Sequence, residues 1–133
     1  MSVVNYRRLT VGMVIALIAV GVLAGAGPAF PRDEVGGTSS WRFLATNGAP
    51  AAHALLGTFV LVGAALMTWT ARRRFMPSLI LVGTGVSVVA GFWYVQAHLP
   101  EAALTAMTIG WLIALAGSVT ELIGTRRRAA NTV

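Results

Sequence analysis

Two histidines, His53 and His98, are the residues whose chemistry stands out in this 133-residue chain. Each lies beside a long apolar run, and because the chain has no cysteine, thiolate metal sites, iron–sulfur clusters and disulfides are excluded. Two neutral imidazoles that face each other between helices can hold a haem iron. The pair therefore predicts a bis-histidine haem site; the alternative is a pair of interfacial histidines that bind no cofactor.

The elements that must position these histidines are four apolar helices. The chain is 56% hydrophobic and 11% charged, with a mean hydropathy of +0.76, which is typical of a protein embedded in a bilayer. Roughly 20 apolar helical residues cross the hydrocarbon core. We expect an all-α, integral membrane four-helix bundle, one domain over residues 1–133, with spans at about 9–27, 51–70, 75–96 and 102–123 and an outer loop at 28–50.

The arginines predict how this bundle is oriented. Only Arg32 and Arg42 would lie on the side that carries the histidines, and the other arginines would all lie on the opposite side. Since cytoplasmic loops are rich in arginine, both termini are expected in the cytoplasm, in a multi-pass protein of the cell membrane. The arginines on the cytoplasmic side are Arg7, Arg8 and the triplets 72–74 and 126–128.

A slot for a flat macrocycle is also predicted. Gly57 lies one turn after His53 on the same helix face, where the absence of a side chain would let a porphyrin edge approach the backbone. The same face continues with Val60, Ala64 and Met67 and is expected to be apolar. Arg32 and Arg42 are the outward cations that could reach haem propionates.

Stripes of small residues predict close contacts between helices. The third span carries Gly83, Ser87 and Gly91, four residues apart, and the fourth carries Ala103, Ala106, Gly110, Ala114 and Gly117.

In the outer loop, Trp41 and Phe43 beside Arg42 suit a short helix at headgroup level, started by a serine cap.

Catalysis by the chain alone is not indicated. The sequence offers no paired carboxylates, no serine beside a base and no phosphate-binding loop after a strand. Asp33 and Glu34 are adjacent acids in an exposed loop, too few for a metal centre. Glu121, one turn from the cytoplasmic end of the fourth span, is interpreted as a structural residue that pairs with nearby arginines or reaches the interface.

Two short segments resemble ligand-bearing helices of the haem A synthase family. Residues 52–57 (AHALLG) are similar to the histidine-to-glycine opening of one such helix, and 96–102 (QAHLPEA) to the start of the next. The resemblance covers one four-helix half of that family and implies one haem between the second and fourth helices at the outer face. Pro50 and Ala54 stand where the family has an acidic residue and an arginine, so its synthase chemistry is not expected. The chain also resembles small four-span actinobacterial membrane proteins through Leu23-Ala24-Gly25.

These observations predict a small b-type cytochrome that holds haem b through His53 and His98, for electron relay or sensing within a larger membrane complex or a homo-oligomer. The partners are membrane lipids and membrane proteins, not nucleic acid. A haem-free accessory subunit is the alternative, and a different tetrapyrrole with a single histidine ligand remains open.

Overall fold

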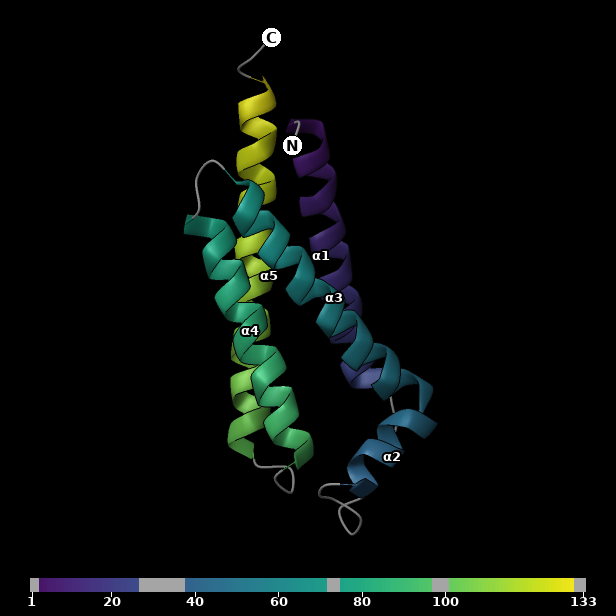
Figure 1. The fold of residues 1–133 in the computed structure, drawn as a ribbon. Helices are drawn as coiled ribbons and strands as arrows, with labels where there is room; N and C mark the ends of the chain where they lie inside the picture. The colour runs from purple at the N-terminus through teal and green to yellow at the C-terminus, as the bar shows by residue number, and fades with distance from the viewer. Residues whose placement is uncertain (1–2, 27–37, 72–74, 97–100, 131–133) are drawn as a thin grey trace.

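The computed structural model describes residues 3–26, 38–71, 75–96 and 101–130. Within these ranges only Asn47 and Ala71 lie outside helices, which confirms the all-α prediction. The helices are α1 (Val3–Ala26), α2 (Thr38–Thr46), α3 (Gly48–Thr70), α4 (Phe75–Gln96) and α5 (Glu101–Ala130), arranged as shown in Figure 1.

The four long helices form a bundle. α1 packs against α3 and α5, and α4 also packs against α3 and α5, so α3 and α5 occupy opposite corners. The start of α3 and the start of α5 lie at the same end of the bundle, the end at which α2 also lies (Figure 1).

The outer surface of the bundle is apolar. All four long helices are long and apolar enough to cross a membrane. Large hydrophobic side chains are exposed along their outward faces, among them Phe59 (71% exposed) and Val89 (69% exposed). Side chains of this kind are stable in lipid and unfavourable in water, so the described surface has the polarity of a membrane-embedded protein.

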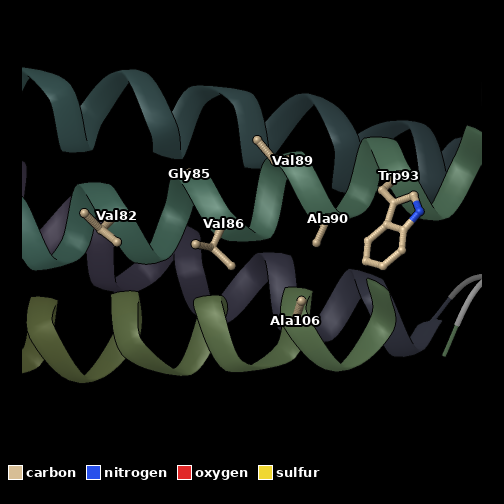
Figure 2. A pocket seen from close by; sticks show the side chains of 7 residues that line it. All are labelled: Val82, Gly85, Val86, Val89, Ala90, Trp93 and Ala106. Carbon is tan, nitrogen blue, oxygen red and sulfur yellow. The ribbon is translucent and has the colours of Figure 1, made fainter. Parts of the chain in front are cut away.

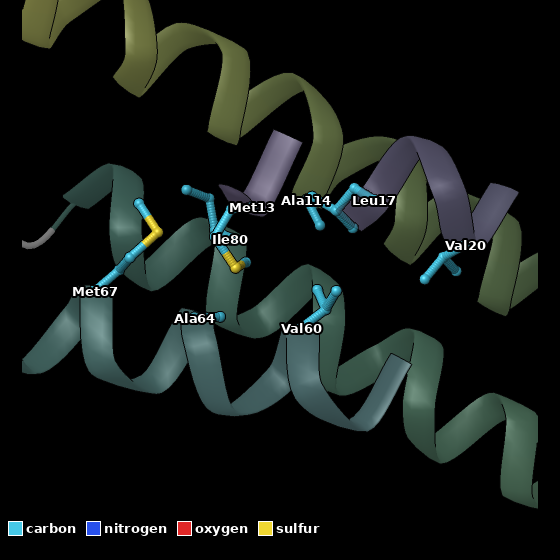
Figure 3. Packing of buried hydrophobic residues seen from close by; sticks show 8 residues of the cluster. All are labelled: Met13, Leu17, Val20, Val60, Ala64, Met67, Ile80 and Ala114. Carbon is cyan, nitrogen blue, oxygen red and sulfur yellow. The ribbon is translucent and has the colours of Figure 1, made fainter. Parts of the chain in front are cut away.

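The interior is a layer of aliphatic side chains from all four long helices. In Figure 3 these side chains converge between the ribbons, and each is at most 9% exposed. The cluster comprises Met13, Leu17 and Val20 of α1, Val60, Ala64 and Met67 of α3, Ile80 of α4 and Ala114 of α5.

Backbone lies against backbone where α4 packs on α5, at the predicted small-residue stripes. A Cβ atom placed on Gly83 would lie 2.7 Å from the carbonyl oxygen of Gly110, and one placed on Gly110 would lie 2.6 Å from that of Gly83. One turn further on, Ser87 Oγ donates a hydrogen bond of 2.8 Å to the carbonyl oxygen of Met107. Since only glycine allows backbones this close, the packing that the stripes predicted is confirmed at this seam.

The helix ends differ in places from the predicted spans. α3 begins at Gly48, three residues before the predicted start, with Pro50 in its first turn. A first-turn proline is tolerated because the backbone N–H that it lacks would have no partner within the helix. The short helix expected near Trp41 exists as α2, but it begins at Thr38, so Ser39 and Ser40 lie inside it and do not precede it as caps. α5 continues to Ala130, seven residues beyond the predicted end.

Candidate functional site

His53 lies in the second turn of α3 and is half-buried. Its Nδ1 atom is 3.0 Å from the backbone carbonyl oxygen of Val20 on α1. A carbonyl oxygen can only accept, so Nδ1 carries the hydrogen and donates it. The neutral imidazole then has its lone pair on Nε2, which is the form in which histidine binds a metal ion.

The hydrogen bond from His53 to Val20 resembles the bond that usually orients a histidine ligand at a metal site. A metal-binding histidine usually donates its other ring N–H to a carbonyl or carboxylate, which fixes the ring orientation and the tautomer. The carbonyl of Val20 supplies that acceptor from a neighbouring helix. The bond fixes the orientation of the His53 ring and, in a neutral ring, leaves the lone pair on Nε2.

The helix face that carries His53 is apolar further along α3, as predicted, and it leads into the core. Further along the face, Val60 is 3% exposed, and Ala64 and Met67 are fully buried. A Cβ atom on Gly57 would meet no atom within 4 Å, whereas one on Gly63 would lie 2.6 Å from Met13 Sδ. The packing around α3 is thus tight near Gly63 and open beside Gly57, one turn from His53.

α2 packs against α3 and α4 at the end of the bundle where these two helices diverge. Figure 1 shows the axes of α3 and α4 separating toward α2, which packs against both of them. The rings of Trp41 on α2 and Phe92 on α4 lie with centroids 5.8 Å apart at 49°. Arg42, next to Trp41, is exposed. The structure therefore places Arg42 and His53 at the same end of the bundle.

Two predicted site residues, His98 and Arg32, lie outside the described residues. α5 begins at Glu101, at the end of the bundle where α3 also begins (Figure 1). The pairing of His98 with His53 and the approach of Arg32 to a propionate both remain predictions. Among the described residues, no three histidine, aspartate or glutamate side chains gather to hold a metal ion.

On the described part of the bundle, His53 lines neither of two shallow hollows. The larger has a volume of about 420 Å³ and is almost wholly apolar; it lies along α4 beside Ala106 of α5 (Figure 2). The smaller lies between α3 and α4, beside Trp69 and Leu81. The larger is lined by Val82, Gly85, Val86, Val89, Ala90, Trp93 and Ala106. Both are formed by surface that would face lipid.

Sequence reasoning missed a second side-chain contact to α1. The indole Nε1 of Trp111 on α5 donates a hydrogen bond of 2.8 Å to the carbonyl oxygen of Leu17. Its ring packs where a Cβ on Gly21 would be only 2.7 Å away. A tryptophan in the middle of an apolar span signals such a bond, because an indole N–H in hydrocarbon needs an acceptor. The sequence does not say which helix provides it.

No family model matches this chain, and neither the curated proteins nor the solved structures contain a significantly similar one.

Proposed function

We propose that this chain is a small membrane cytochrome of the b type that holds one haem near one end of the bundle through His53 and His98. The observation that supports it is the bond from His53 Nδ1 to the carbonyl of Val20, which leaves Nε2 with the lone pair. Open space beside Gly57 on the same face adds support. So does the resemblance of residues 52–57 and 96–102 to haem-ligating segments.

In this proposal each residue has a limited task. Val20 holds the imidazole of His53 in one orientation, Gly57 leaves room beside it, and Arg42 supplies positive charge at the same end. A bound haem would supply one-electron redox chemistry at its iron. The protein would then relay or sense single electrons, without a catalytic reaction of its own, as part of a larger membrane complex or a homo-oligomer.

The proposal includes a location. The exposed apolar faces suit a multi-pass protein of the cell membrane, and the arginine distribution favours both termini in the cytoplasm. His53 would then lie toward the outer surface.

The test separates the two tasks of His53 with two substitutions. His53→Asn keeps a side-chain N–H that can donate to Val20 but has no imidazole for the iron, and His53→Ala removes both. Protein expressed with ample haem is purified in detergent, and its oxidised and reduced absorption spectra are recorded. The wild type is expected to show a sharpened α band and a b-type pyridine haemochrome. Both variants, and His98→Ala, are expected to lose the six-coordinate spectrum.

Thermal unfolding of the same samples provides the control. Without haem, His53→Ala should be less stable than His53→Asn by about 0.5–1.5 kcal/mol, the usual net value of one hydrogen bond. A featureless wild-type spectrum would reject the cytochrome. An unchanged haem spectrum in His53→Asn would show that the protein binds haem but that His53 is not a ligand of the iron.

A haem-free accessory subunit is the second candidate, and one observation favours it. His53 and Trp111 donate to the carbonyls of Val20 and Leu17, nearly one turn apart on α1. In this interpretation both side chains simply fasten neighbouring helices to α1. The same experiment distinguishes the candidates, because an accessory subunit would show the stability difference between the two His53 variants and no haem in any sample.

A further inference from the structure

The larger hollow, along α4, has the length of one membrane leaflet. Figure 2 shows Val82 and Trp93 at its two ends. These residues are eleven positions apart, so the hollow extends about 16 Å along the helix. The hydrocarbon core of a bilayer is about 30 Å thick, and one leaflet supplies half of it. Since Trp93 lies in the last turn of α4, the hollow runs from the central part of the helix to the end where α2 lies (Figure 1).

The lining of this hollow suits a hydrocarbon chain. Val82, Val86 and Val89 line it and are exposed, and a Cβ atom on Gly85 between them would meet no atom within 4 Å. The volume of about 420 Å³ lies within the range of sites that hold apolar ligands. A helix of a second copy would cross the entire core, whereas an acyl chain ends at the bilayer midplane. A hollow that covers one leaflet therefore fits a chain better than a helix.

The end of the hollow near α2 carries groups that suit a lipid headgroup. Trp93 lines this end, and tryptophan is enriched at the boundary between hydrocarbon and headgroups. The ring of its neighbour Phe92 lies 5.8 Å from that of Trp41 on α2, measured between centroids. Arg42 follows Trp41 and is exposed. The contact between α2 and α4 thus holds an arginine at the depth where the hollow ends.

The charges at this end favour an anion. Arg42 is the cation that the described residues place here, since the other described arginines lie on the first turns of α1 or the last turns of α5. The described carboxylate at this end is Glu101, at the start of α5. It precedes Ala106, which lines the hollow, by five residues, so the two side chains leave α5 in directions about 140° apart. Glu101 therefore points away from the face of α5 that borders the hollow.

We propose that this hollow binds one anionic phospholipid, with an acyl chain along α4 and the phosphate near Arg42. A zwitterionic lipid can place the same chain in the hollow, but its headgroup has no net charge for the arginine to attract. The hollow is separate from the proposed haem site, because neither His53 nor Gly57 lines it. Arg42 belongs to both proposals, and the test below reads lipid contacts without any haem signal.

The experiment maps lipid contacts by photocrosslinking. Full-length protein is reconstituted in phosphatidylcholine vesicles that contain a trace of a phospholipid with a diazirine on one acyl chain. Phosphatidylglycerol is the anionic probe, and phosphatidylcholine with the same modified chain is the zwitterionic control. Light converts the diazirine to a carbene with loss of nitrogen, the carbene inserts into nearby C–H bonds, and mass spectrometry locates the adducts. Circular dichroism verifies that each variant is folded.

The anionic probe is expected to label the hollow, residues 82–93 and Ala106, about fivefold more than the control, the preference that one arginine near a membrane surface provides. Arg42→Gln should abolish this difference, and Arg42→Lys should keep it. Gly85→Leu fills the hollow and should reduce labelling there by both probes. Gly12→Leu is the matched control, because Gly12 is an exposed glycine of α1 with equally free surroundings, and labelling of the hollow should not change.

Three results would overturn the proposal. Even labelling of the exposed faces of all four long helices would indicate only the ordinary lipid around a membrane protein. Equal labelling of the hollow by the two probes would show that the charge of the headgroup is not recognised. Protection of the hollow from both probes would show that it is not a lipid site, and light scattering in detergent would then test whether a second copy covers it.

Discussion

At the scale of single residues, two side-chain donors from different helices converge on α1. His53 of α3 and Trp111 of α5 donate to the carbonyls of Val20 and Leu17, which already belong to the helical ladder of α1. A carbonyl oxygen has two lone pairs, so it can accept a second bond without breaking the helix. In a membrane, such bonds between helices contribute to helix association together with the packing of small residues.

Trp111→Phe tests the value of one of these bonds. Phenylalanine keeps a ring against Gly21 but cannot donate to Leu17, so we expect a loss of about 0.5–1.5 kcal/mol in the free energy of unfolding. Trp69→Phe is the control, because Trp69 is 85% exposed and would face lipid. Thermal unfolding in detergent, followed by circular dichroism, measures both. Equal stability of the two variants would show that the Trp111 bond contributes nothing measurable.

The sequence could predict part of the site at this scale. The periodicity of α3 predicted that Val60, Ala64 and Met67 share an apolar face with His53, and the structure shows in addition that all three are buried. The acceptor for His53 could not be predicted, because Val20 offers only its backbone carbonyl, a group that every residue has. His98 and Arg32 lie outside the described residues, so their roles stay predictions.

At the scale of helices, the contact between α4 and α5 differs from the others because backbone meets backbone. Gly83 and Gly110 each lie against the carbonyl of the other. By contrast, Gly63 of α3 lies against the flexible end of Met13, which can move aside. α4 and α5 therefore tolerate much less change than α1 and α3.

Gly83→Ala and Gly85→Ala form a matched pair that measures this intolerance. The added methyl group at Gly83 would lie within 2.7 Å of the Gly110 carbonyl, so we expect a destabilisation of about 1–3 kcal/mol from overpacking. At Gly85 it would meet nothing within 4 Å. There alanine should be neutral or stabilise the helix by up to about 1 kcal/mol. Equal unfolding temperatures for the two variants would contradict the close backbone contact between α4 and α5 at Gly83.

Helix positions were predicted better than helix ends. Apolar length located all four spans, because crossing hydrocarbon demands about 20 such residues. The end of α5 was missed, because Arg126 and Arg127 were interpreted as a stop at the membrane surface. Arginine is a good helix former, and nothing after Gly124 breaks the helix, so it continues into the polar region with both side chains exposed.

At the scale of the whole molecule, the two ends of the bundle differ in character. One end has α2 and the diverging axes of α3 and α4 (Figure 1), and His53 lies near it at the start of α3. The other end has exposed arginines at the start of α1 and the end of α5, and buried Glu121 lies on α5 toward that end. Composition predicted a four-helix bundle but not which helices are neighbours. Which helices are neighbours depends on particular contacts between them, such as that of Gly83 with Gly110. The sequence of one helix does not say which other helix it contacts.

Orientation in the membrane can be measured directly, because the chain has no cysteine. Glu101→Cys and Arg127→Cys place single thiols at exposed positions at opposite ends of α5. In intact cells, a maleimide that cannot cross membranes should label Glu101→Cys only, and Arg127→Cys should react after permeabilisation. The reverse pattern would contradict the orientation that the arginines predict.

The α4–α5 seam also has a consequence for biosynthesis. Chains are made from the N-terminus, so α1, α3 and α4 enter the bilayer before α5 exists. Until then, the glycine face of α4 has no partner, and the carbonyl of Leu17 lacks its indole donor. α5 supplies both in a single step, because Gly110 and Trp111 are consecutive residues. Insertion of the last span therefore completes a bundle in which α1, α3 and α4 already have contacts with one another.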